Sequence, residues 1–274
     1  MSILRHIKRF FKNILPRTVV SFIIRYRGEK LRPIDLSVLS IIDESDSKIL
    51  SDPLFLECHI LPALGFNNEN MHEFPQELYP FCGKGLLHWQ YPNQFGRYLS
   101  LLSKLKPESY LEIGVRHGGT FIITLEYLKK FIAVKNAIAI DIAYPPSIVM
   151  YKEKNSVVTF YQMNSQLDSF TKLLSKEKNI DLVFIDGNHE EWACMNDFNN
   201  VKDVANMIAL HDIASDVCPG VKNSWVFIKN NYSSQYLFFE FTDQYESVKA
   251  KTGQSFFGIG LAVKKEFAGL RGIK

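Results

Sequence analysis

The sequence predicts an α/β fold with a doubly wound, mostly parallel sheet. The first observation is a succession of five short apolar runs, each of the length of a buried strand. The second is that polar side chains directly follow every run, at the edge where open α/β sheets bind ligands. The runs cover residues 109–113, 136–141, 157–161, 180–185 and 207–210.

The first run ends in a glycine-rich turn that leads into a helix. Gly114, Gly118 and Gly119 lack the Cβ atoms that would keep a ligand from the backbone. The helix after Thr120 directs its N-terminal amides toward the same crevice, and Glu112 can attract a cationic ligand group. The spacing Gly-x-x-x-Gly-Gly differs from the Gly-x-Gly-x-x-Gly of dinucleotide sites. Taken alone, the turn is also compatible with a tight strand-to-helix connection that binds nothing.

The later runs add an ordered series of polar groups. Asp141 ends the second run, where an acid is placed to accept hydrogen bonds from ribose hydroxyls. Asn164 and Ser165 follow the third run. The fourth run leads into Asp186-Gly-Asn-His, and the fifth ends in His211-Asp212.

These motifs resemble those of class I S-adenosylmethionine-dependent methyltransferases. Within that class the chain is most similar to metal-dependent O-methyltransferases of sugars and macrolides, and to their cephalosporin-hydroxylase-like relatives. The resemblance covers roughly residues 85 to 265. It implies a Rossmann-like sheet of seven strands, mostly parallel with an antiparallel last strand. Residues 236–241 and 258–263 supply the last two strands, and Pro219 opens the helix that precedes them.

The resemblance also assigns roles in cofactor binding. Glu112 would lie near the cationic end of S-adenosylmethionine, Asp141 would hold the ribose hydroxyls, and Thr120 would cap the helix. Asn164 and Ser165 would lie near the adenine. The full set of implied cofactor-binding residues is Glu112, Gly114, Gly118, Gly119, Thr120, Asp141, Asn164, Ser165 and Asp186.

In metal-dependent members an acid after the fourth strand and an acidic pair after the fifth bind magnesium. Those positions here are Asp186, His211 and Asp212, and the residue in the position of the general base is His189. His211 departs from the pattern because imidazole suits Mn²⁺, Fe²⁺ or Zn²⁺ better than Mg²⁺. Three alternatives follow: a different metal, a His211 that does not ligate, or a protein without metal.

Each of these residues also has an ordinary structural interpretation. Asp186 has the position of an N-cap for a helix that begins near Glu190. His189 is also compatible with an ordinary loop residue, and Asp212 with a turn residue. The chemistry nevertheless favours the set. A hydroxyl acceptor needs its proton removed, for which histidine has a suitable pKa, and carboxylates suit Mg²⁺ or Mn²⁺.

The 274 residues are 46% hydrophobic, which allows one large domain with an appendage. Four cysteines without a Cys-x-x-Cys pair favour a reducing, cytoplasmic compartment. Basic residues concentrate in the first 32 positions, which hold nine Lys or Arg and one acid. The remainder is mildly acidic, so we expect no nucleic-acid partner.

We expect three regions. Residues 1–32 form a basic amphipathic helical segment, 33–84 an extension that acts as a lid or dimer contact, and 85–274 the methyltransferase domain. Apolar residues of 1–27 recur at helical spacing, which fits peripheral contact with an anionic membrane. The alternative is a helix docked on the domain or at a homo-oligomer interface.

Three functions remain open. The first is a metal-assisted O-methyltransferase for a small molecule or glycan-containing metabolite, with His189 as base. The second is a methyltransferase that needs no metal. The third is a non-catalytic protein of this fold that is attached through its basic N-terminus. A hydroxylase, suggested by the cephalosporin relatives, rests on fold analogy alone.

Overall fold

A computed structural model describes residues 31–177 and 180–273. The predictions for residues 1–27, and all but Leu31 and Arg32 of the segment 1–32, lie outside these residues. Within the described part of the chain, no helix is long and apolar enough to cross a bilayer.

The centre of the molecule is a sheet of seven strands in the order β3-β2-β1-β4-β5-β7-β6. The first five are parallel to one another, and β7 runs antiparallel to both β5 and β6. The predicted doubly wound sheet with an antiparallel last strand is therefore confirmed. The strands are β1 Ser109–Ile113, β2 Asn136–Asp141, β3 Val158–Gln162, β4 Ile180–Ile185, β5 Ala205–His211, β6 Tyr236–Phe241 and β7 Ile259–Lys264.

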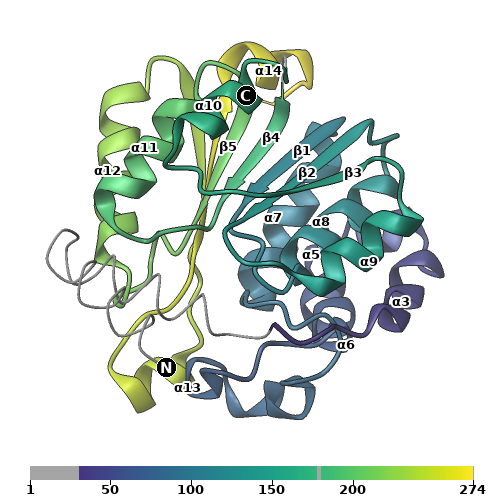
Figure 1. Cartoon of the computed structure of the whole chain (residues 1–274). Helices are drawn as coiled ribbons and strands as arrows, with labels where there is room; N and C mark the ends of the chain where they lie inside the picture. The colour runs from purple at the N-terminus through teal and green to yellow at the C-terminus, as the bar shows by residue number, and fades with distance from the viewer. Residues whose placement is uncertain (1–30, 178–179, 274) are drawn as a thin grey trace, which may run out of the picture.

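Helices cover both faces of the sheet (Figure 1). One face carries α7 (Pro92–Leu105), α8 (Gly119–Lys129) and α9 (Pro146–Lys154). The other carries α10 (Asp168–Leu174), α11 (Glu191–Val201) and α12 (Pro219–Tyr232). Proline is the first residue of α7, α9 and α12, a position where its missing N–H costs nothing. The remaining helices after β6 are α13 (Glu246–Thr252) and α14 (Lys265–Leu270).

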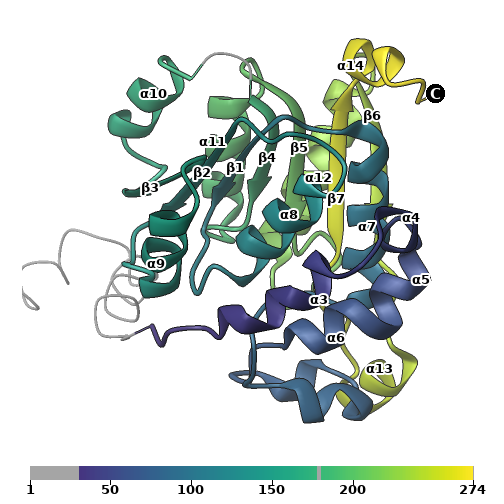
Figure 2. The same ribbon diagram turned by 90° about the vertical axis from the view of Figure 1, so that its right-hand side faces the viewer.

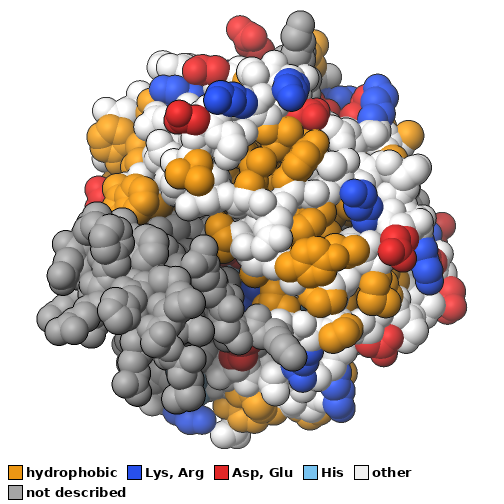
Figure 3. Space-filling model, in the orientation of Figure 1, with side chains coloured by type: hydrophobic (Ala, Val, Ile, Leu, Met, Phe, Trp, Pro, Cys, Tyr) orange, Lys and Arg blue, Asp and Glu red, His pale blue; other side chains and the backbone are white. Residues whose placement is uncertain are grey.

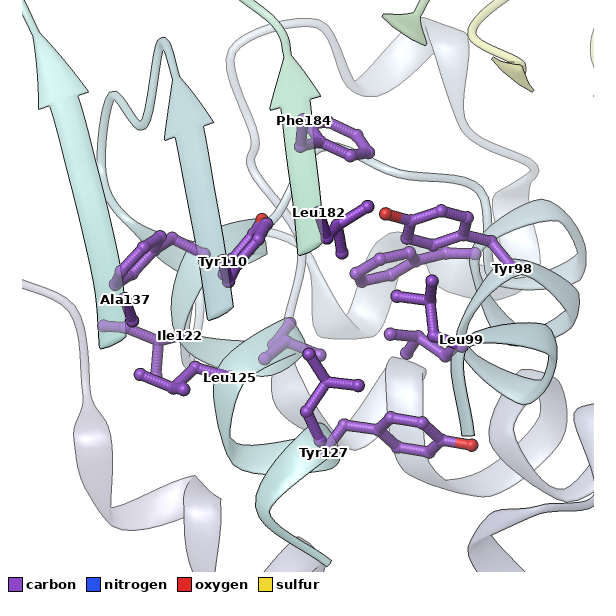
Figure 4. Packing of buried hydrophobic residues seen from close by; sticks show 14 of the residues in the cluster. Tyr98, Leu99, Tyr110, Ile122, Leu125, Tyr127, Ala137, Leu182 and Phe184 are labelled. Carbon is purple, nitrogen blue, oxygen red and sulfur yellow. The ribbon is translucent and has the colours of Figure 1, made fainter. Parts of the chain in front are cut away.

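The extension consists of short helical pieces that pack onto the same side as α7 and α8 (Figure 2). Leu50, Leu56 and Leu61 are fully buried in one core with the side chains of α7, α8 and β4. Figure 4 shows part of this core, where Tyr98 and Leu99 of α7 face Leu182 and Phe184 of β4. The pieces are η1 Leu36–Leu39, α3 Ser40–Asp43, α4 Ser47–Leu50, α5 Pro53–Phe55, η2 Leu56–Ile60, α6 Leu61–Leu64, η3 Met71–Glu73 and η4 Gln76–Phe81.

The surface drawn in Figure 3 carries groups of apolar side chains near the middle of the view and charged side chains of both signs around them. The exposed apolar side chains of the described residues include Tyr144, Leu167 and Trp192, which are each more than half exposed. All three line the cavity described below.

Candidate active site

A cavity of about 1220 Å³ lies at the carboxyl ends of the parallel strands. It spans the ends of β1, β2, β3 and β4, and includes the point between β1 and β4 where the strand order reverses. Ligands bind at this reversal in open α/β sheets. Pockets for one small ligand are typically about 300–1,000 Å³, so this cavity has room for a cofactor and part of a second molecule.

The glycine-rich turn after β1 forms one wall of the cavity. Gly114, Arg116 and Gly118 have positive φ angles of 91°, 46° and 94°. A Cβ on Gly114 would lie 2.1 Å from the carbonyl oxygen of Asp186. The close approach of the backbone after β1 to the backbone after β4 therefore requires glycine at this position. The glycine-rich turn therefore needs glycine both for its positive φ angles and for the close approach of its backbone to the end of β4.

Asp141 fixes this turn to the end of β2. Its two carboxylate oxygens accept hydrogen bonds from the backbone N–H groups of Arg116 and Ala143, both at 2.7 Å. A carboxylate accepts up to about four hydrogen bonds, so each oxygen keeps a lone pair for a ligand. Burial raises the pKa of Asp141, and the two backbone N–H groups oppose that effect.

Glu112 is 1% exposed and lines the same cavity. It shares a face of β1 with Tyr110, whose hydroxyl donates a hydrogen bond to its carboxylate. Burial raises the pKa of Glu112 well above its usual range, and the charges of Asp186 and Asp141 act in the same direction. A cationic ligand in the cavity would offset the cost of these neighbouring acids.

The structure corrects the expected role of Thr120. Helix α8 begins at Gly119 and its N-cap is Gly118 in the left-handed region, so Thr120 lies within the first helical turn and does not cap it. Gly119 and Thr120 both line the cavity, and the first amides of α8 have no partner in the helix. The anion-attracting end of α8 therefore faces the cavity as predicted.

Asn164 and Ser165 lie where the sequence placed them, in the loop after β3 and on the wall of the cavity. The next residue, Gln166, also lines the cavity and donates a hydrogen bond of 2.8 Å to buried Asp197 of α11. The Asn196 side chain donates to the side-chain oxygen Oε1 of Gln166 at 2.8 Å. These bonds hold Gln166, which the sequence did not indicate.

The polar groups after β4 and β5 converge on one point. His211 Nδ1 lies 3.1 Å from Asp186 Oδ1 and 3.7 Å from Asp212 Oδ2. His189 Nε2 lies 3.4 Å from Asp186 Oδ1 and 3.6 Å from Asp212 Oδ2. The ligand atoms of Asp186, His211 and Asp212 lie within 4.8 Å of one another, so they can hold one cation. Asp186 does not cap α11, whose N-cap is Glu190.

Charge compensation sets the protonation of this cluster. Burial disfavours the charged form of Asp186, but His211 and His189 outweigh it and hold the pKa of Asp186 below its ordinary value. Burial lowers the pKa of His189, but Asp186, Cys218 and Asp212 together raise it well above its usual range. In the absence of another cation, the two carboxylates therefore favour protonated histidines.

Cys218 belongs to the cluster although the sequence did not suggest it. Its thiol donates to Asp212 Oδ2 at 3.3 Å and lies 3.3 Å from His189 Nδ1. The chain brings it there because a short loop after β5 returns to Pro219, the first residue of α12. A cysteine six residues after Asp212 and directly before a helix-opening proline was the only available signal.

The extension also contributes to the site. Glu69 pairs with Arg116 at 2.5 Å and with His117 at 3.5 Å, both on the glycine-rich turn. The Arg116 guanidinium lies 5.1 Å from the centre of the Trp89 ring. Trp89 also lines the cavity, whereas Phe74 and Tyr91 are buried in a separate cluster with Phe257.

The match to a protein-family model decides the class of the domain. Residues 111–213, from β1 through the cluster after β5, match the model described as a methyltransferase domain. This match identifies residues 111–213 as a methyltransferase domain. Comparison with the curated proteins gives no match.

Several solved structures resemble the chain distantly. The O-methyltransferase TomG from Streptomyces achromogenes, in complex with SAM, is 14% identical over 65% of this chain and 82% of its own, with a TM-score of 0.47. An O-methyltransferase from Bacillus cereus, in complex with SAH, is 15% identical over 88% and 96%, with the same TM-score. MycE, in complex with Mg, SAH and mycinamycin VI, is 15% identical over 66% and 50%, with a TM-score of 0.44. At this distance nothing about the acceptor or the metal follows from the similarity.

The raised pKa of Asp197, which lies behind the cavity, can be tested by measuring how stability depends on pH. It is fully buried, and burial raises its pKa to about 7. Between about pH 4 and 7 the native protein holds a proton that the unfolded chain releases, so this acid lowers stability as the pH rises. We expect Asp197→Asn to increase the free energy of unfolding relative to wild type, by up to about 4 kcal/mol at pH 8 and less at pH 5. Urea unfolding of wild type and variant at both pH values measures this difference in the free energy of unfolding. A difference that is the same at pH 5 and pH 8 would contradict the raised pKa of Asp197.

Proposed function

We propose that the protein transfers a methyl group from S-adenosylmethionine to a hydroxyl of a small molecule or glycan-containing metabolite. The observation that carries the proposal is the cluster of Asp186, His189 and Asp212 at the edge of the cofactor cavity. In this proposal His189 removes a proton, and the two carboxylates help to hold a cation beside it. An acceptor hydroxyl needs both because it is a weak nucleophile until its proton is removed.

Cofactor binding is assigned to the wall of the cavity. Asp141 has free lone pairs for ribose hydroxyls, and Glu112 supplies a buried carboxylate toward a cationic ligand. The glycine-rich turn and the start of α8 contact the rest of the ligand through backbone atoms. S-adenosylmethionine supplies the electrophilic methyl group, and its sulfonium and amino groups match the acidic lining.

The donor set of Asp186, His211 and Asp212 fits a divalent cation. Two carboxylates suit Mg²⁺, and the imidazole of His211 shifts the preference toward Mn²⁺ or a similar metal. A cation there would supply Lewis acidity toward a hydroxyl oxygen and positive charge beside His189. His189 is 42% exposed and lines the cavity, so its Nε2 atom can accept the proton of the acceptor.

The N-terminal extension would act on cofactor affinity through Glu69. The hydrogen bond with His117 and the charge of Arg116 lower the pKa of Glu69 to about 2, so the pair persists at neutral pH. We expect Glu69→Gln to weaken S-adenosylmethionine binding about fivefold, because partly exposed ion pairs contribute about 1 kcal/mol or less. Calorimetric titration at pH 7 measures the change. Glu77→Gln, on the exposed surface of η4, is the matched control, and equal affinity in wild type and Glu69→Gln would exclude this role.

The reaction is tested with methyl-labelled S-adenosylmethionine and a panel of hydroxylated, glycosylated and amino-bearing small molecules. We expect label on oxygen, with transfer lost in a chelator and restored by Mg²⁺ or Mn²⁺. Transfer that persists in the chelator would favour a metal-independent methyltransferase. This alternative is supported by His211, which stands where metal-dependent members have an acid. Label on nitrogen would contradict the hydroxyl acceptor.

A further inference from the structure

The cluster contains a second group of ligand atoms, distinct from the one assigned above. His189, Asp212 and Cys218 each place one ligand atom within 4.8 Å of the others. The two groups share only Asp212. We propose that His189, Asp212 and Cys218 form a site for a thiophilic divalent cation such as Zn²⁺ or Co²⁺, and that its occupation blocks the proposed general base.

The spacing of the three residues fits tetrahedral coordination. Cys218 Sγ lies 3.3 Å from Asp212 Oδ2. His189 offers either Nδ1, which lies 3.3 Å from Cys218 Sγ, or Nε2, which lies 3.6 Å from Asp212 Oδ2. In a tetrahedral zinc site, bonds of about 2.0 Å to nitrogen and oxygen and about 2.3 Å to sulfur place ligands about 3.3–3.5 Å apart. With a single His189 nitrogen, the three ligand atoms lie within 4.8 Å of one another, so side-chain rotation has to draw them together around the ion.

The chemistry of the three ligands separates this site from a magnesium site. Thiolate and imidazole prefer zinc, cobalt and other borderline or soft ions, whereas Mg²⁺ takes oxygen ligands. Binding forms a metal–sulfur bond and releases the thiol proton of Cys218 to solvent. Three protein ligands leave a fourth tetrahedral position for water or substrate.

The ion has a route to the site. Cys218 and Asp212 are 8% and 6% exposed, but His189 is much more exposed and lines the cavity. An ion can therefore enter through the cavity beside the imidazole. The neighbouring thiol of Cys194 is also buried, but its donor bond goes to the Asn188 carbonyl oxygen at 3.2 Å and it is outside both ligand groups.

The consequence for His189 rests on the proposed function. If the ion binds Nε2, that atom no longer accepts a proton. If it binds Nδ1, the neutral ring carries its proton on Nε2, which again cannot accept one. Either mode removes the base, so a thiophilic ion should inhibit methyl transfer that Mg²⁺ or Mn²⁺ supports.

The test of binding uses Co²⁺ with the full-length, metal-free protein. We expect a thiolate-to-cobalt charge-transfer absorption in wild type that Zn²⁺ displaces and excess Mg²⁺ does not. The absorption should disappear in Cys218→Ser, persist in Cys194→Ser and weaken in His189→Ala. Absence of the band from wild type, or its persistence in Cys218→Ser, would overturn the site. Thermal unfolding of each variant verifies that the loss is not due to misfolding, and His189→Ala gives an independent answer if Cys218→Ser does not fold.

A second measurement tests the effect on activity. In excess Mg²⁺, Zn²⁺ should inhibit wild type at a concentration at least tenfold lower than it inhibits Cys218→Ser, each relative to its own uninhibited rate. Equal inhibition of both would overturn the blocking of the base. Binding of S-adenosylmethionine is measured separately by calorimetry, so a failure of the proposed function is not confused with failure of the metal site.

Discussion

Asp141→Ala is expected to weaken the binding of S-adenosylmethionine about 100-fold. The carboxylate is placed to accept hydrogen bonds from the ribose hydroxyls, and it also holds the glycine-rich turn through the Arg116 N–H. Hydrogen bonds to a charged group contribute about 1.5–3 kcal/mol each, and a factor of 100 corresponds to about 2.7 kcal/mol. Calorimetric titration of wild type and variant measures the ratio.

Two variants separate the role of this carboxylate from a general loss of charge. Asp141→Asn keeps the size of the side chain but replaces one acceptor by a donor, so affinity should fall nearly as far. Asp203→Ala removes an exposed carboxylate at the amino end of β5, away from the cavity, and should bind the cofactor normally. Unchanged affinity in Asp141→Ala would remove Asp141 from the cofactor site.

His189→Ala is expected to slow methyl transfer about 10²- to 10⁴-fold, the usual contribution of a general base. Affinity for S-adenosylmethionine should change less than threefold, because the imidazole faces Asp186 and Asp212 and not the glycine-rich turn. Single-turnover transfer to an acceptor found in the panel measures the rate. His59→Ala, on the exposed face of η2, is the control. A rate equal to wild type would show that another group removes the proton.

The parallel sheet and its carboxyl edge could be predicted because each parallel strand is a short, mainly apolar run followed by polar residues. Asp141, Asp186, His189 and Asp212 therefore emerged from local sequence alone. They come together because parallel strands end at one edge, a property of the fold class. Their roles in catalysis and binding stay predictions.

The extension was harder to predict because its helices are very short. Pro53, Pro62, Pro75 and Pro80 interrupt residues 33–84, and no piece is long enough to show a helical period. Burial against α7 and α8 fixes these pieces, and such contacts are not visible in local sequence.

Long-range contacts explain the remaining differences. Glu69 reaches Arg116 across 47 positions, and Cys218 lies against His189 across 29. No sequence motif predicts either of these two contacts. Thr120 was misplaced for a local reason: Gly118 adopts a left-handed conformation and takes the N-cap position of α8.

The most direct test of the account is calorimetric titration of the purified protein with S-adenosylmethionine, with and without Mg²⁺ or Mn²⁺. We expect binding in the micromolar range that depends on Asp141. Absence of binding under every metal condition would contradict the cofactor site, and with it the proposed methyl transfer.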